Sequence, residues 1–307
     1  MIKKIVVTLL SIPFIFFSFN IFTYEKLEVP LIYQLTNIHI LNLVNHYKPK
    51  FLVIDYSKDG TEKNKFSPLE VKALKNTGAI VLAYLSIGEA ESYRWYWKDS
   101  YHSYPPKWLG KENPMWPENY KVKYWENEWK QIIFEYLDKI IEQGFDGVYL
   151  DRIDSYKYWN ENGYEISFTS KKMIEFIHEI FLHAKNQKSN FLIVPQNGED
   201  IIEYDNNNIY INSISGIGIE SLFYFVGEKI DDKIVNERLK HILKIKNSGK
   251  FVLVTDYIYN PRNPDEEKIL NFIELCQDYG FYGYPANINL KLSDISGALK
   301  YYKKVKK

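Results

Sequence analysis

Cysteine and histidine are scarce in this 307-residue sequence. The single cysteine, Cys276, lies in an apolar helical pattern, so the sequence provides no disulfide framework. The six histidines show no spacing typical of metal ligands, and His178 and His183, five positions apart, fall on different faces of a helix. We therefore expect neither a protein-bound metal nor another cofactor.

An excess of charge of either sign is also absent, because Lys+Arg and Asp+Glu both total 39. Nothing in this balance predicts a nucleic-acid partner. The motifs G-x-S-x-G, the P-loop and H-E-x-x-H do not occur, and the glycines of GIGIES (216–221) precede an acid instead of opening a helix. Serine hydrolases, nucleotide-binding enzymes and zinc proteases are therefore disfavoured.

The first 24 residues have the pattern of an export segment. Lys3 and Lys4 precede an uncharged, mostly apolar run over residues 5–22. No small-residue cleavage site follows, and the run is near the length that crosses a bilayer, so residues 1–24 are either a signal peptide or an N-terminal membrane anchor. We expect the remainder, residues 25–307, to be secreted or tethered at the outer face of the cytoplasmic membrane through residues 5–22.

Short runs rich in β-branched and aromatic residues alternate with segments of helical period after this point. These runs cover residues 31–35, 51–56, 80–87, 145–151, 191–197, 214–220, 251–257 and 281–286. Eight such strands, with helices expected at 37–47, 68–77, 126–143, 170–187, 231–247, 265–279, 293–305 and after Glu199, match a (β/α)8 TIM barrel better than a doubly wound sheet. We expect one domain, present as a monomer.

One connection, after the third strand, is much longer than an ordinary βα loop and is rich in aromatic residues. Six of the seven tryptophans lie in or just after it: Trp95, Trp97, Trp108, Trp116, Trp125 and Trp129. Long loops in compact domains are usually functional, and aromatic rings can stack on sugars. A loop of this size also needs a small core of its own, so we expect most of these rings to be structural and about a third to touch ligand.

Acidic residues recur where the predicted strands end. They are Asp55, Glu89, Glu91, Asp151, Asp154, Glu199, Glu220 and Asp256. The clearest case is GFDGVYLDRID (144–154), a turn and a short apolar strand that ends in Asp151. In parallel α/β proteins the C-terminal ends of strands carry the chemistry, although an Asp at such a turn can also cap the next helix.

Strand alternation places several of these acids on one face. In the fourth and sixth strands, Asp151 and Glu220 share a face with glycines while bulky aliphatic residues occupy the other face. The glycine-bearing face is expected to point into the barrel, and the same rule turns Asp55 inward. Two carboxylates in one cleft with aromatic walls and no metal are the equipment of a glycoside hydrolase. For Asp55 and Asp256, substrate binding and a structural role remain equal alternatives.

Five blocks of the sequence resemble glycoside hydrolase family 114, the endo-α-1,4-polygalactosaminidase-like (β/α)8 proteins. The blocks are YLSIGEAESYRWYW (84–97), NPMWPENYKVKYW (113–125), GFDGVYLDRIDSYKYW (144–159), PQNGE (195–199) and GIGIESLFY (216–224). The resemblance extends from about residue 33 to 286. It implies an exported hydrolase of α-1,4-linked galactosamine-containing polysaccharide that retains the anomeric configuration.

The resemblance also implies roles for individual residues. Asp151 matches the family's catalytic Asp and is expected to be the nucleophile, and Glu220 matches its catalytic Glu and is expected to be the general acid/base. The resemblance suggests Asp55, Glu89, Asp154, Asn197 and Asp256 as sugar-binding positions, and we also expect Tyr84 and Trp125 to bind substrate. Hydrolysis of another polysaccharide, or noncatalytic binding of a cationic glycan, remain the alternatives.

Overall fold

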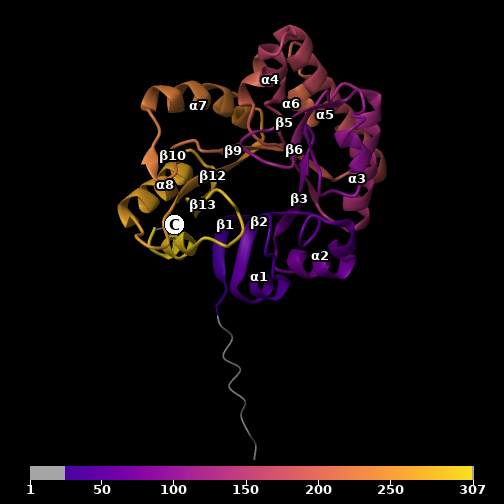
Figure 1. Ribbon diagram of the computed structural model, residues 1–307. Helices are drawn as coiled ribbons and strands as arrows, with labels where there is room; N and C mark the ends of the chain where they lie inside the picture. Colours follow the sequence, from indigo (N-terminus) through magenta and orange to yellow (C-terminus); the bar gives the residue numbers. More distant parts are fainter. Residues whose placement is uncertain (1–24, 306–307) are drawn as a thin grey trace, which may run out of the picture.

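Eight parallel strands form the centre of the molecule (Figure 1), in a computed structural model that describes residues 25–305. They are β1 (Leu27–Gln34), β2 (Tyr47–Ile54), β3 (Ile80–Ser86), β7 (Gly147–Asp151), β8 (Leu192–Pro195), β9 (Gly216–Glu220), β12 (Phe251–Tyr259) and β13 (Tyr282–Asn287). Each of the eight predicted strands is present. The predicted (β/α)8 barrel is therefore confirmed.

The strands follow one another around the barrel in chain order. One hydrogen-bonded ladder joins β1, β2, β3, β7 and β8, and a second joins β9, β12 and β13. A parallel bridge between Gln196 and Gly218 connects the two ladders beyond β8, and β1 lies beside β13. Asp151 and Glu220 are the last residues of β7 and β9, which β8 separates.

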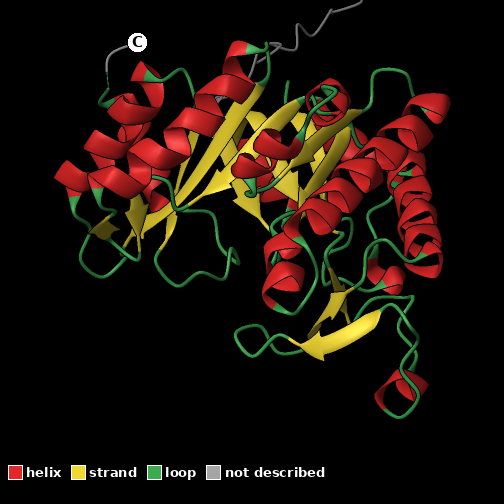
Figure 2. Ribbon diagram, turned by 90° about the horizontal axis from the view of Figure 1, so that it is seen from above, coloured by secondary structure: helices red, strands yellow, loops and turns green. Residues whose placement is uncertain are grey.

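Helices surround the strands (Figures 1 and 2). The main ones are α1 (Ile40–His46), α2 (Pro68–Lys75), α3 (Asn127–Glu142), α5 (Ile166–Gln187), α7 (Asp232–Asn247) and α8 (Glu266–Asp278). At the start of α2, Ser67 and Glu70 form a capping box before Pro68. Among residues 25–305 no helix has the length and apolar character needed to span a bilayer, and the predicted export segment lies outside the described residues.

Two predicted helices are instead short 3-10 helices, and two α-helices were not predicted. The 3-10 helices are η3 (Glu199–Tyr204) and η4 (Gly297–Lys303), and the unpredicted helices are α4 (Ser155–Glu161) and α6 (Ile209–Ser213). Segments this short do not set their own helix type, because a helix of few turns depends on tertiary packing more than on propensity.

The long connection after β3 builds a small antiparallel sheet outside the barrel strands (Figure 2). Its strands are β4 (Glu89–Glu91), β6 (Asn119–Val122) and β5 (Leu109–Glu112), in that order. Trp108 is 1% exposed, and its ring lies 5.0 Å from that of the fully buried Trp129. Most aromatic residues of this connection are buried or packed against the core, as expected of a loop with its own small core.

The interior of the barrel is filled by large side chains that face small ones. The ring of Tyr149, on β7, packs edge-on against Tyr33 of β1 at 5.3 Å. The Tyr149 hydroxyl occupies the space that a side chain at Gly218 would need. These contacts place the glycine-bearing faces of β7 and β9 toward the interior, as alternation predicted.

Candidate active site

A cavity of about 450 Å³ lies at the C-terminal ends of the barrel strands. The acids that line it are Asp55, Asp59, Glu89, Glu91, Asp151 and Glu220, and the cations are Arg94, Arg152 and Lys291. Of the predicted site residues, it brings together Asp55, Tyr84, Glu89, Asp151, Asn197 and Glu220. These come from different strands and meet because parallel strands present their C-terminal ends on one side of a barrel.

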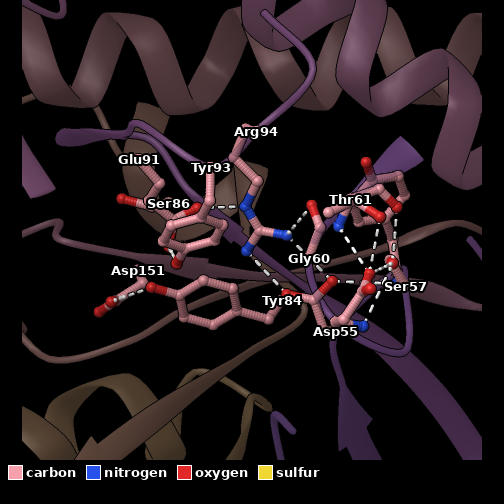
Figure 3. A network of polar contacts seen from close by, with 12 residues as sticks. Asp55, Ser57, Gly60, Thr61, Tyr84, Ser86, Glu91, Tyr93, Arg94 and Asp151 are labelled. Atoms are coloured by element: carbon pink, nitrogen blue, oxygen red, sulfur yellow. Dashed lines mark hydrogen bonds and ion pairs between the residues drawn. The ribbon is translucent and has the colours of Figure 1, made fainter. Parts of the chain in front are cut away.

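Asp151 projects from the end of β7 into this cavity. The hydroxyl of Tyr84, on the neighbouring β3, donates a hydrogen bond of 2.7 Å to Oδ2 of Asp151 (Figure 3). Burial is the main reason that the pKa of Asp151 is raised to about 7; the negative charge of Glu220 acts in the same direction, while Arg152 and the Tyr84 hydroxyl oppose the shift. The carboxyl group is therefore poised to change protonation near neutral pH.

Hydrogen bonds with Tyr257, on β12, and with Asn197, in the loop after β8, hold Glu220 in place. The hydroxyl of Tyr257, on β12, donates to its Oε1 at 2.6 Å. The Glu220 backbone amide donates to Oδ1 of Asn197 at 2.9 Å, which fixes the strand end. Burial raises the pKa of Glu220, and hydrogen bonds from Tyr257, Gln196 and Asn197 act in the opposite direction.

Asp55 and Glu91 form a buried network with Arg94 in one wall of the cavity (Figure 3). Arg94 binds Asp55 through both terminal nitrogens, at 3.0 and 2.7 Å, and its Nε donates to Glu91 at 2.6 Å. The Tyr93 hydroxyl donates to the other Glu91 oxygen at 2.7 Å. One guanidinium thus faces two carboxylates, and this network has one unbalanced negative charge when both acids are ionised.

Glu89 lies in a second network, with Lys121 and Arg152. Its carboxylate is contacted by Lys121 and lies 3.0 Å from Nη2 of Arg152. The side-chain amide of Asn113 donates to it at 3.0 Å. Glu89 is only 2% exposed. Its carboxylate would therefore affect a bound substrate mainly through the groups that surround it, and less by direct contact.

Three residues that we expected to bind substrate do not line the cavity. Asp256 is fully buried on β12, where it accepts hydrogen bonds from the backbone amides of Leu222, Phe223 and Tyr224 at 2.7–2.8 Å. Asp256 therefore holds the turn that follows Glu220. This is the structural role that the sequence left open beside substrate binding.

The other two are Asp154 and Trp125. Asp154, one turn beyond β7, has a side chain that is 39% exposed and lies 3.9 Å from Arg152. Trp125 packs in an aromatic cluster with Trp159 and Tyr164, at 5.5 and 5.1 Å between ring centroids. The sequence could not show that Trp125 lies outside the cavity, because a loop residue has no periodic pattern that shows which way its side chain points.

Sequence reasoning did not assign to the site several residues that line the cavity: Tyr33, Tyr93, Trp116, Arg152, Gln196 and Tyr257. Tyr257 could have been found, because it lies on the same strand face as Thr255, which pairs with Glu220. Within residues 25–305 no group of three or more His, Cys, Asp or Glu residues is arranged to hold a metal ion.

Comparison with known proteins identifies the family. The model of glycoside-hydrolase family GH114 matches residues 32–299. The chain belongs to this family. An uncharacterized protein of Methanocaldococcus jannaschii is 48% identical over 267 residues, 86% of this chain and 77% of that one. Another from Thermotoga maritima is 43% identical over 248 residues, which cover 80% and 76%. This GH114 chain is thus a glycoside hydrolase by family.

Solved structures with the same fold are much more distant in sequence. The glycoside hydrolase domain of PelA from Pseudomonas aeruginosa has a TM-score of 0.67 at 12% identity, covering 88% of this chain and 98% of that one. Aspergillus fumigatus Ega3, solved in complex with galactosamine, has a TM-score of 0.62 at 17% identity, covering 87% and 94%. At these identities the likeness concerns the fold alone.

Proposed function

We propose that this protein hydrolyses an α-1,4-linked galactosamine-containing polysaccharide with Asp151 and Glu220 as its two catalytic acids. The observation that carries the proposal is the meeting of these carboxyl groups in one cavity, at the ends of strands that only β8 separates. Two carboxyl groups on either side of a sugar bond are what most glycoside hydrolases use. The complex of Ega3 with galactosamine supports the choice of sugar.

The proposed reaction retains the configuration of the sugar. Asp151 attacks the anomeric carbon as that carbon's bond to the leaving oxygen breaks, and Glu220 gives its proton to that oxygen. Glu220 then removes a proton from water, which attacks the same carbon and releases Asp151. The raised pKa of Glu220 favours the proton-donating role.

An amino sugar would help Asp151 to act as the nucleophile. The pKa of Asp151 is about 7 because burial disfavours its charged form. A substrate ammonium group elsewhere in the cavity would lower this pKa, since a nearby positive charge stabilises a carboxylate. Binding of a cationic polymer would thereby ionise the nucleophile.

We also propose that the protein acts outside the cytoplasm. The support is the charged and apolar pattern of residues 1–24, which is typical of a signal peptide or an anchor. A polymer substrate cannot readily cross a membrane, so an extracellular monomer, released or tethered, fits the proposed activity. Fractionation of cells with a C-terminal tag would test this; recovery of the intact chain in the cytosol would contradict it.

The activity test is a polysaccharide screen with product mass analysis. Reducing-sugar release from partly deacetylated α-1,4-galactosaminogalactan is measured for the wild type, Asp151→Asn and Glu220→Gln, beside neutral polysaccharides. We expect the wild type alone to release galactosamine-containing oligosaccharides. Release only from another polymer would change the substrate assignment, and equal activity in all three proteins would exclude the proposed acids. Binding without any cleavage would instead indicate a glycan-binding protein.

A further inference from the structure

Trp116 differs from the other tryptophans of the chain in its exposure and its position. All seven tryptophans lie among the described residues; Trp116 is 46% exposed, whereas the other six are partly or fully buried. Trp116 is also the only one of the seven that lines the cavity, which Tyr93 and Asn119 line as well. Its ring is therefore placed where it can meet a ligand.

The ring of Trp116 is free of the packing that holds the other aromatic residues of this connection. Trp97, Trp108 and Trp125 each pack against another ring, at 4.7–5.1 Å between centroids. Within residues 25–305 Trp116 makes no such ring contact, and it is neither part of the core nor packed against it. A role in the small core of the connection therefore does not account for Trp116.

The backbone around Trp116 is held on both sides. The residue lies in the turn between β5 and β6, with Pro114 and Pro117 close by in the sequence. Its amide donates to the carbonyl of Asn113 at 3.1 Å, and its own carbonyl accepts from the amide of Asn119 at 3.2 Å. Each proline fixes one φ angle as well. The turn thus presents the ring from a restrained backbone, which lowers the entropy that binding would cost.

This turn is also joined to the floor of the candidate active site. The side-chain amide of Asn113 donates to Glu89 at 3.0 Å, and Glu89 lies 3.0 Å from Nη2 of Arg152, the residue after Asp151. Asn119 pairs with Glu91 in the ladder between β4 and β6. The position of Trp116 is therefore set by the same segments that build the cavity wall.

Trp116 and the catalytic candidates come from different parts of the fold. Asp151 and Glu220 end strands of the barrel, whereas Trp116 belongs to the small antiparallel sheet outside it (Figure 2). All three nevertheless line one cavity. A chain of sugars in this cavity could meet the two acids with one unit and the ring with another.

A tryptophan ring at such a place suits a sugar ring as its ligand. The indole face is flat and apolar, and the C–H groups on one face of a pyranose can stack on it. In a sugar of galactose configuration the axial 4-hydroxyl lies on one face, so that the opposite face presents an unbroken patch of C–H groups. A free ammonium group on the sugar would add attraction to the negative face of the ring.

We propose that Trp116 is a stacking site for a sugar ring of the substrate other than the unit whose bond is cleaved. The ligand class is a pyranose with an unbroken C–H face, held as one unit of a longer chain. This inference rests on the proposed function and narrows its substrate to oligosaccharides and polymers, because a short ligand leaves the Trp116 site empty when it lies between Asp151 and Glu220.

Binding of a short and a long ligand tests this separately from catalysis. The dissociation constants of the α-1,4-linked galactosamine disaccharide and heptasaccharide are measured by calorimetry. All proteins are full-length and carry Glu220→Gln, so that neither ligand is cleaved. The ratio of the two constants gives the gain from chain length. Because both ligands bind the same sample, partial unfolding cancels in this ratio.

We expect Trp116→Ala to reduce the gain from chain length about three- to tenfold, the usual effect of losing one aromatic contact. Trp116→Phe keeps a ring and should retain most of the gain. Tyr104→Ala is the matched control and should leave the ratio unchanged, since Tyr104 is 82% exposed in the same connection but does not line the cavity.

Tryptophan fluorescence gives a second measurement that a purely structural role would not affect. The heptasaccharide should change the emission of the parent protein, because the ligand covers the exposed ring of Trp116. In Trp116→Phe the heptasaccharide should still bind but should leave the emission unchanged, since none of the other six tryptophans lines the cavity.

The outcomes separate this inference from the proposed function. The assignment of Trp116 would be overturned, with the hydrolase proposal left standing, if Trp116→Ala weakened both ligands equally or neither, if Tyr104→Ala had the same effect, or if the emission change persisted in Trp116→Phe. A reduced gain in a protein whose Glu220 form hydrolyses no galactosamine polymer would support Trp116 and overturn the proposed function. Failure of both ligands to bind the parent would overturn both.

Discussion

The hydroxyl of Tyr149 fills the space beside Gly218 inside the barrel. An added Cβ at Gly218 would lie 1.9 Å from that hydroxyl oxygen, far inside van der Waals contact. The ring cannot retreat easily, because Tyr149 is 1% exposed and packs against Tyr33. Tyr149, two residues before Asp151, thus requires a glycine at position 218, two residues before Glu220.

We predict that Gly218→Ala destabilises the protein by roughly 1–3 kcal/mol, the usual cost of overpacking a dense core. It should also lower activity, because Tyr149 and Gly218 each lie two residues before one of the two proposed catalytic acids, on the same strand face. Urea denaturation measures the change in the free energy of unfolding. In a Tyr149→Ala background the same substitution should cost much less, since the obstructing ring is gone. Equal costs in the two backgrounds would contradict this relationship.

Asp256 is predicted to act on the site through the backbone that follows Glu220. Asp256→Asn replaces one acceptor oxygen with a donor that faces the backbone amides of residues 222–224. We expect a loss of roughly 1–3 kcal/mol in the free energy of unfolding, because buried donors are left without partners. Asp154→Asn, at an exposed acid, is the control and should change stability by less than about 0.5 kcal/mol. Similar losses in the two variants would argue against this role.

Tyr84 is predicted to set the acid limb of the pH–activity profile. Asp151 must be ionised to attack, and its pKa is about 7, so kcat/KM should rise with pH through this region. The Tyr84 hydroxyl stabilises the carboxylate, so Tyr84→Phe should raise the pKa and move the acid limb to higher pH. Tyr93→Phe removes a hydroxyl bonded to Glu91 instead and should leave that limb in place. A limb unchanged by Tyr84→Phe would be inconsistent with Asp151 as its source.

Asp151 is also predicted to reduce stability at neutral pH. Its pKa is about 7 in the folded protein against a normal value of 3.8, so the folded state holds a proton that the unfolded state has released. The free energy of unfolding therefore falls as pH rises from about 4 to 7. Asp151→Asn cannot ionise and should raise Tm by roughly 3–8 °C at pH 8, but much less at pH 4. An equal change in Tm at both pH values would contradict the shifted pKa.

Much of the fold could be predicted because each strand lies in a regular pattern. All eight strands and the inward faces of β7 and β9 follow from alternation and from the glycines opposite Tyr149. The catalytic candidates could be placed for the same reason, since each is the last residue of its strand.

Residues that depend on contacts between distant segments could not be placed from the sequence. Asp256 lies near a strand end like Asp151, but it has the opposite parity to Tyr257 and faces away from the cavity. Trp125 belongs to an irregular loop whose packing is decided by Trp159 and Tyr164. The networks around Arg94 and Glu89 join segments up to 63 residues apart, and only the folded chain shows which acids they neutralise.

The central claim is that Asp151 and Glu220 divide nucleophilic attack and proton transfer between them, and azide rescue of alanine variants tests it most directly. Azide can attack in place of the missing Asp151 carboxylate, or in place of the water that Glu220 would deprotonate, and NMR of the anomeric configuration of the glycosyl azide distinguishes the two cases. With an α-linked galactosaminyl substrate bearing a good leaving group, Asp151→Ala should yield the β-azide by direct displacement. Glu220→Ala should yield the α-azide, because azide then attacks the covalent intermediate on Asp151. The opposite pairing of products, or wild-type hydrolysis by either variant without azide, would contradict the assignment.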